Sequence, residues 1–290
     1  MKATKALKTA GLACLISAVN PTISAALAAT PAVSGPLAGA PSALSYADLA
    51  DLADAAPLVV DARIVKTIAL PPETPPQAPP GHRRLYVEAQ VTALIRGDGG
   101  ISPTIGYLYD APLDRRGKIA KLKKMPVLLF ARPGARPGQI QLIARDAQIA
   151  STPAEVDRVK RIVADLLAND APPRVTGLGD AFHVAGTVAG EGETQIFLRT
   201  ANGEPVSLSI LRRPGQAPRW AVALGEIVDE AARPPQPGTL LWYRLACALP
   251  PELPARATRS LAVQDAEAAR ADYRLVRQSL GSCGRTRAAS

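Results

Sequence analysis

The segment Leu85-Tyr-Val-Glu-Ala-Gln-Val-Thr-Ala-Leu-Ile-Arg96 decides the fold class. Every other residue from Leu85 to Ile95 is apolar, whereas the residues between them are mostly polar. This period-2 pattern is typical of a β-strand with one buried face. Twelve residues at about 3.3 Å each would span roughly 40 Å, which is long for a strand. We therefore expect the strand to coil or bulge as part of a small barrel. Its outward face would carry Tyr86, Glu88, Gln90 and Thr92.

Four shorter segments around the long strand predict further strands of the same domain. Alternating or continuous apolar residues, bounded by turn residues, are typical of strands. Residues 70–81 contain six prolines. Because proline removes amide donors and favours extended geometry, these residues predict an exposed loop. The predicted strands span residues 58–65, 104–109, 126–131 and 139–144.

Two helices flank this strand-rich region. Ser45 can cap a short helix that runs to about residue 55, with Leu49 and Leu52 on one face. Thr152-Pro-Ala-Glu155 is a capping box with proline at the first helical position, and apolar residues follow at helical spacing. We expect this second helix to lay an apolar stripe on the preceding sheet. The first domain would then cover residues 45–170.

Residues 174–290 form a second predicted domain, which is again rich in strands. Gly190-Glu-Gly192 predicts one hairpin turn, and Asn202-Gly203 predicts a further hairpin with a type I′ turn. A helix over residues 265–280 would end at Gly281, which suits a C-terminal cap. The predicted fold class is mainly β with a few helices (α+β): an OB-like barrel, then a β-sandwich-like domain with a C-terminal helix. The predicted strands of the second domain span residues 182–188, 194–199, 206–210, 220–224 and 240–249.

The first 28 residues are typical of a cleavable secretory signal. Three lysines precede a short apolar stretch over residues 10–19, and Ala26-Leu-Ala28 is a small-residue cleavage site. Cys14 leaves lipidation as an alternative, although Gly11 stands where a large aliphatic residue is wanted. Residues 29–44 would form a disordered lead of Ala, Pro, Gly and Ser. We expect a periplasmic or secreted protein without a transmembrane anchor. Its net charge would fall from +9 to +6 when the three signal lysines are lost.

Two cysteines remain after cleavage, Cys247 and Cys283. In an exported protein such a pair is a candidate disulfide, and two free thiols are the alternative. A bridge between them would clamp the C-terminal helix to the predicted strand over residues 240–249. We therefore predict a Cys247–Cys283 disulfide.

The first domain resembles the netrin/TIMP-like version of the OB fold. The resemblance rests on the first helix, the strand from residue 58, the end of the long strand at Ala93-Leu-Ile-Arg-Gly-Asp98, and Pro126-Val-Leu-Leu-Phe-Ala131. It covers residues 46–149 and extends to uncharacterised exported bacterial proteins. Eukaryotic members inhibit metalloproteases with an N-terminal cysteine that reaches the zinc. The expected mature N-terminus has no cysteine near it, so the resemblance implies a fold and not that activity.

Catalytic chemistry has little support in the sequence. The two histidines, His82 and His183, form no metal-ligand spacing, and there is no G-x-S-x-G elbow. Asp61, Glu88 and Asp110 could share one sheet face, but nothing sets a pair at catalytic separation. Further carboxylates at the hairpin turns are Glu191, Glu193 and Glu204. We therefore predict no catalytic residues, no metal site and no cofactor.

The strongest functional candidate is the basic stretch from Asp114 to Lys124, which holds six cations and one anion. It could dock on an acidic surface such as lipid phosphates, cell-wall polymers or an acidic protein. The alternative is a solvated hairpin that shields a sheet edge, a task for which lysine is suited. Nucleic acid is not expected as a partner, because the chain is exported. The predicted ligand-binding residues are Arg115, Arg116, Lys118, Lys121, Lys123 and Lys124.

These observations favour an exported, non-enzymatic binding module of the cell envelope. Its partner would be an anionic envelope component or another envelope protein. The alternatives are a hydrolase of envelope polymers that uses carboxylates, and an inhibitor of an envelope protease. Only the fold resemblance suggests the inhibitor.

Overall fold

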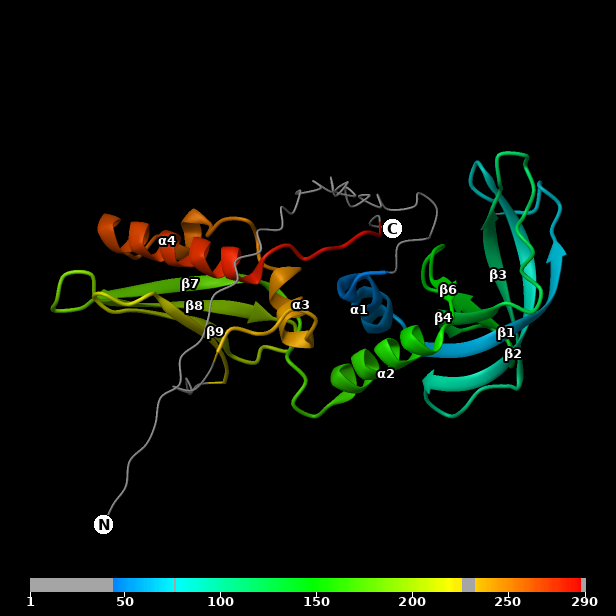
Figure 1. The fold of residues 1–290 in the computed structure, drawn as a ribbon, viewed down its shortest axis with the longest axis horizontal. Helices are drawn as coiled ribbons and strands as arrows, with labels where there is room; N and C mark the ends of the chain where they lie inside the picture. The colour runs from blue at the N-terminus through cyan, green and yellow to red at the C-terminus, as the bar shows by residue number, and fades with distance from the viewer. Residues whose placement is uncertain (1–43, 76, 226–232, 288–290) are drawn as a thin grey trace, which may run out of the picture. The chain divides into compact units, whose positions relative to one another are not determined.

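Two β-sheets and four α-helices make up the residues that the computed structural model describes, which are 44–75, 77–225 and 233–287 (Figure 1). The predicted signal and nearly all of the predicted lead lie outside these residues. The first sheet contains β1 (Leu58–Ala69), β2 (His82–Arg96), β3 (Thr104–Pro112), β4 (Pro126–Pro133), β5 (Ile140–Leu142) and β6 (Gln148–Ala150). The second contains β7 (Val175–Ala185), β8 (Gly192–Thr200), β9 (Val206–Arg212) and β10 (Arg219–Leu224).

The long predicted strand is β2, and it begins three residues earlier than expected. Leu85, Val87 and Ala89 are buried, so the predicted inward register is confirmed over this part of the strand. The irregularities lie in the pairing with its partner β1, whose register shifts at three places. These shifts let a long pair of strands coil instead of remaining flat.

The first sheet is a nearly closed, barrel-like sheet. Its strands follow the order β3-β2-β1-β4-β5, with β6 added beside β4. The Gly106 N–H donates to the Gly138 carbonyl at 2.8 Å and brings β3 to the start of β5. The interior is filled by apolar side chains such as Val60, Val87 and Leu129.

Strand β4 and the first residues of β1 are buried on both faces. Val60 and Leu129 point into the barrel, whereas Val59, Leu128 and Phe130 belong to a second core outside it. A strand that is covered on both sides has a continuous apolar sequence, which explains the uninterrupted run in β4.

Two helices lie outside the barrel, α1 (Tyr46–Ala55) and α2 (Pro153–Leu167), and they pack against each other (Figure 1). The predicted Ser45 cap is present as a full capping box with Asp48. At α2 only half of the predicted capping box is present. The Thr152 side chain accepts the Glu155 N–H, but the Glu155 side chain pairs with Arg158 instead of the Thr152 backbone. The apolar stripe of α2 is buried in the core that α1 and the outer face of β4 share.

The second sheet has the order β10-β9-β8-β7, and helix α4 (Val263–Leu280) lies along one of its faces (Figure 1). The predicted α+β class, mainly β with a C-terminal helix, is confirmed. Within the described ranges, a helix and not another sheet forms the second layer. The hairpin at Gly203 is present, but Asn202 does not have a positive φ, so its turn is not type I′.

The strand predicted over residues 240–249 is wrong, because Leu240–Ala246 forms helix α3. Thr239 caps this helix by accepting the Trp242 N–H at 3.3 Å. Its residues are buried on nearly every side, so their apolar run has no helical periodicity and reads like a buried strand. A short 3-10 helix follows at Ala255–Thr258. Among the described residues, no helix is both long and apolar enough to cross a membrane.

Candidate functional site

The six predicted ligand-binding cations lie together in the loop between β3 and β4, which we call the basic loop (residues 114–124). All six side chains are exposed. Asp114, the one anion, accepts the backbone N–H groups of Arg116 and Lys118, at 2.8 Å each, and so shapes the turn. In the described part of the chain, no ion pair is recorded for any of the six cations.

The basic loop is anchored to the barrel by its apolar residues and its backbone. Ile119 and Leu122 pack against the barrel core. The Lys124 N–H donates to the Ile64 carbonyl at 2.8 Å, and Arg63 donates to the Lys124 carbonyl at 3.1 Å. These contacts hold Lys124 at a φ of 73°, which non-glycine residues rarely adopt. The loop therefore presents a fixed cluster of cations to solvent.

A cavity of about 670 Å³ lies on the outer side of the barrel between β3 and β5. Tyr86, from the predicted outward register of β2, lies directly over Gly106, where a Cβ atom would collide with the phenol group. Half-exposed Leu108 and the β5 residues Ile140 and Leu142 add apolar surface. The cavity has the size and mixed lining of a ligand pocket.

A partly buried ion pair borders this cavity. Arg84 Nε lies 2.7 Å from Asp110 Oδ1, and Arg84 Nη2 lies 2.8 Å from Asp110 Oδ2. The hydrogen bond to Asp110 raises the pKa of Arg84. Asp110 is thus the ion-pair partner of Arg84.

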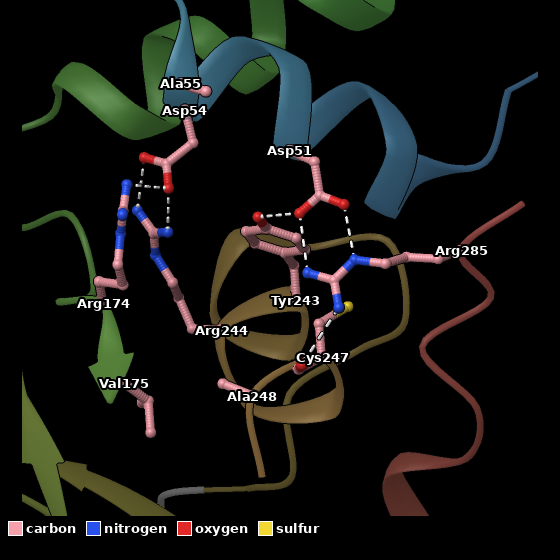
Figure 2. Close-up of a pocket in the computed structure, with 10 residues that line it drawn as sticks. All are labelled: Asp51, Asp54, Ala55, Arg174, Val175, Tyr243, Arg244, Cys247, Ala248 and Arg285. Carbon is pink, nitrogen blue, oxygen red and sulfur yellow. Dashed lines mark hydrogen bonds and ion pairs between the residues drawn. The ribbon is translucent and has the colours of Figure 1, made fainter. Parts of the chain in front are cut away.

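A second cavity, of about 290 Å³, is lined by α1, α3 and the start of the second sheet (Figure 2). The Asp54 carboxylate forms ion pairs with the guanidinium groups of Arg174 and Arg244, each at 2.7 Å. Asp51 accepts the Tyr243 hydroxyl at 2.6 Å and a two-bond contact from Arg285. Burial favours a higher pKa for Asp54, but Arg244 and Arg174 outweigh it and lower that pKa. Both carboxylates are committed to these contacts, which join elements that are distant in sequence.

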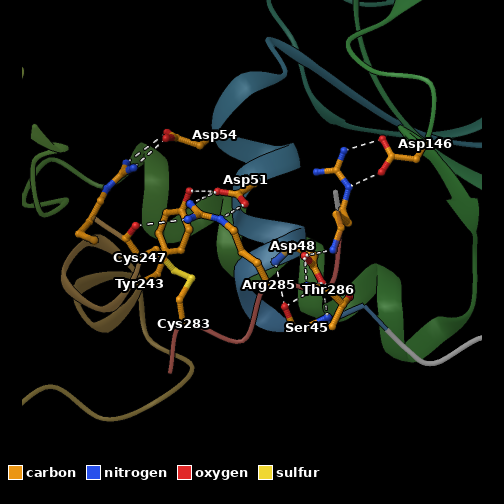
Figure 3. Close-up of polar contacts among 12 residues, drawn as sticks. Ser45, Asp48, Asp51, Asp54, Asp146, Tyr243, Cys247, Cys283, Arg285 and Thr286 are labelled. Carbon is orange, nitrogen blue, oxygen red and sulfur yellow. Dashed lines mark hydrogen bonds and ion pairs between the residues drawn. A yellow bond between two sulfur atoms is a disulfide. The ribbon is translucent and has the colours of Figure 1, made fainter. Parts of the chain in front are cut away.

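The C-terminal segment (residues 282–287) extends this network along α1 (Figure 3). The Thr286 hydroxyl donates to Asp48 at 2.6 Å, and the Arg287 side chain holds Asp146 with bonds of 2.7 and 2.6 Å. We did not predict this network from the sequence. The signal that could have indicated it is the spacing of Asp48, Asp51 and Asp54, which places three carboxylates on one helix face.

The carboxylates considered for catalysis are not brought together as a reactive pair. Asp61 accepts the Ser151 hydroxyl at 2.7 Å, and Glu88 lies 3.3 Å from Lys66. Asp110 is held by Arg84, as described above. Glu191, Glu193 and Glu204 lie in or beside the hairpin turns of the second sheet. The described residues contain no cluster of three or more His, Cys, Asp or Glu suited to a metal ion.

The two histidines have separate environments. His82 Nδ1 lies 3.1 Å from the Pro80 carbonyl, beside the proline-rich loop. His183 Nδ1 lies 2.8 Å from the Thr194 hydroxyl, which in turn donates to the buried Asp272 of α4. Arg212 also binds Asp272. This chain of contacts satisfies a buried carboxylate and fastens α4 to the second sheet.

Cys247 and Cys283 lie at disulfide-bonding distance and are joined in the structure. Cys247 ends helix α3, so the bridge links two helices and not a helix and a strand. Cys283 lies near the start of the C-terminal segment, two residues before Arg285 (Figure 3). The bridge therefore holds the start of the segment whose later residues bind α1.

Fold and surface together define a two-sheet α+β protein with an anchored cluster of cations at one end of a barrel-like sheet. The sequence matches no family model, and the search of curated proteins also finds no match. Its function must therefore be argued from its own residues.

Proposed function

We propose that this protein is an exported binding module of the cell envelope that docks on an anionic partner through its basic loop. The observation that supports this proposal is the exposure of all six cations on a loop that the barrel core anchors. A cluster of like charges held in one place raises the local concentration of an oppositely charged partner.

Export is part of the proposal and rests on the signal-like first 28 residues. The Cys247–Cys283 bridge supports it, because disulfides persist mainly in oxidising compartments. Recovery of the protein from the cytoplasmic fraction with its first 28 residues intact would contradict it, and mass spectrometry of the intact chain from each cell fraction gives that answer.

The basic loop can be tested by charge reversal. Lys118, Lys121, Lys123 and Lys124 are changed together to Glu, and cosedimentation with isolated bacterial envelopes is measured. The loop backbone is held by main-chain bonds and by the Asp114 carboxylate, so the fold should survive these changes. Because each cation near an anionic surface contributes about 1 kcal/mol, we expect affinity to fall about 100-fold or more.

A matched control separates the basic loop from the overall charge of the protein. Arg213, Arg256, Arg259 and Arg274 are exposed cations of the second half of the chain, and their change to Glu alters the net charge equally. This control should keep most of the binding. If both variants bind as the wild type does, or lose binding equally, the basic loop is not the docking site.

The alternatives gain less support. Of the six carboxylates considered for a hydrolase, Asp61, Glu88 and Asp110 each have a hydroxyl or cationic partner. The protease-inhibitor alternative rests on the proposed resemblance to the OB fold alone, and that resemblance supplies no inhibitory residue. Binding therefore remains the better-supported function.

A further inference from the structure

The two strands that would close the barrel, β3 and β5, do not form a continuous ladder. Within the described residues, the isolated bridge between Gly106 and Gln139, the residue just before β5, is the only strand pairing assigned between these two parts of the sheet. Farther along β3, Leu108 and Asp110 line the cavity of about 670 Å³. Part of the β3 edge is thus left beside a cavity instead of a strand.

The alternation of the backbone shows which groups face this cavity. Along an antiparallel strand, successive residues direct their N–H and C=O groups to opposite sides. The Gly106 N–H points toward β5, because it donates to Gly138. Leu108 and Asp110, two and four residues farther along, must direct their backbone groups to the same side. The backbone groups of Tyr107 and Tyr109 instead face β2, with which β3 pairs.

Unpaired backbone groups at a strand edge are a template for another strand. We propose that the open edge of β3 at Leu108 and Asp110 binds an extended, acidic peptide segment of a partner protein, which pairs with β3 as an added antiparallel strand. This inference rests on the proposed function and specifies the anionic partner as a protein segment.

The charges beside the edge determine the direction and chemistry of this peptide. Strand β3 runs directly into the basic loop, and exposed Arg145 also lines the cavity. An antiparallel peptide would therefore place its N-terminal residues next to the cations and its C-terminal residues near Gly106. Acidic residues belong at its N-terminal end, and apolar residues belong at alternate positions of the rest, where Leu108, Ile140 and Leu142 supply apolar surface.

The protein's own lead is a poor candidate for this strand. Pro31, Pro36 and Pro41 interrupt it, and each proline lacks the amide that strand pairing requires. It also contains no acidic residue between positions 29 and 44. A segment of another protein fits the edge better.

The probe is a fluorescein-labelled peptide of four aspartates followed by Thr-Val-Thr-Val-Thr-Val, and its binding is measured by fluorescence anisotropy. Leu108→Pro removes the amide that faces the cavity and leaves the ladder with β2 intact. Leu108→Ala is the matched control, because it removes the side chain but keeps the amide. We expect Leu108→Pro to weaken binding at least tenfold and Leu108→Ala to weaken it less than threefold.

Two further measurements keep the inference open to refutation if Leu108→Pro fails to fold. Saturating peptide should slow amide exchange at Leu108 and Asp110 of the wild-type protein. The same peptide with its Thr and Val amides methylated should not bind. Absence of binding to the wild type, unchanged exchange at both amides, or equal binding of the methylated peptide would overturn the inference.

The charge-reversed variant distinguishes this inference from the proposed function. If that variant loses envelope binding while Leu108→Pro binds the peptide as the wild type does, the basic loop is a docking site and the strand-pairing inference is wrong. If the charge reversal has no effect on envelopes, the proposed function itself fails.

Discussion

Asp48 is fully buried, yet five donors surround its carboxylate. The Ser45 N–H and hydroxyl donate to it from the N-cap of α1. The Thr286 N–H and hydroxyl and the Arg287 N–H donate to it from the C-terminal segment. Burial favours a higher pKa for Asp48, but these hydrogen bonds together lower that pKa below its usual value. One side chain therefore both begins a helix and holds the end of the chain.

Replacement of Asp48 by Ala should destabilise the protein by about 2–4 kcal/mol. It removes a negative charge in the first turn of α1, worth about 0.3–1 kcal/mol, and charge-assisted hydrogen bonds that contribute about 1.5–3 kcal/mol, whereas the Ser45 cap remains. Urea unfolding at pH 7 measures the loss. The control is Asp157→Ala, an exposed position on α2. A loss no larger than that of the control would contradict the role given to Asp48.

Acid should weaken the fold through the same carboxylates. The pKa values of Asp48, Asp54 and Asp146 are all lowered in the folded protein by the hydrogen bonds and cations around them. Their contribution is therefore fully present above the unfolded pKa, which is about 3.9, and is lost as the pH falls below it. The urea concentration at the midpoint of unfolding should fall between pH 5 and pH 3. It should fall less in the Asp48→Asn variant. Equal drops in both proteins would show that Asp48 is not one of the groups responsible.

At the scale of elements, the sequence predicts the helices and strands that have one apolar and one polar face. Strand β2 and helices α1 and α4 each carry an apolar and a polar side, and each was predicted close to its observed bounds. Helix α3 could not be predicted in this way, because burial on nearly all sides removes the periodicity. The basic loop was visible as a run of cations, whereas the cavity depends on strands that approach from different parts of the chain.

The Cys247–Cys283 bridge should contribute about 3–4 kcal/mol, because it closes a loop over a separation of 36 residues. The double change to Ser should lower the free energy of unfolding by that amount. The wild type measured with a reductant should show the same decrease, and the Ser variant should no longer respond to the reductant. If the wild type under non-reducing conditions contains two free thiols and is as stable as the variant, the bridge is absent in solution.

At the scale of the molecule, one apolar core extends from the outer face of the barrel-like sheet to the second sheet. It includes Phe130 of β4, Leu49 of α1, Leu245 of α3 and Ile210 of β9. The polar contacts of Figures 2 and 3 border this core and join the same helices. The halves that the sequence suggests therefore share a core, while the basic loop and the cavity lie on the barrel.

The central claim is that the basic loop binds an anionic partner. Its most direct test is the fraction of protein that cosediments with isolated envelopes at ionic strengths of about 0.01 M and about 0.15 M, because exposed charges are screened by salt. We predict that the wild type and the Arg213, Arg256, Arg259 and Arg274 control bind well at the lower salt and less at the higher. The variant with Glu at 118, 121, 123 and 124 should bind at neither. Equal cosedimentation of all three proteins would contradict the account.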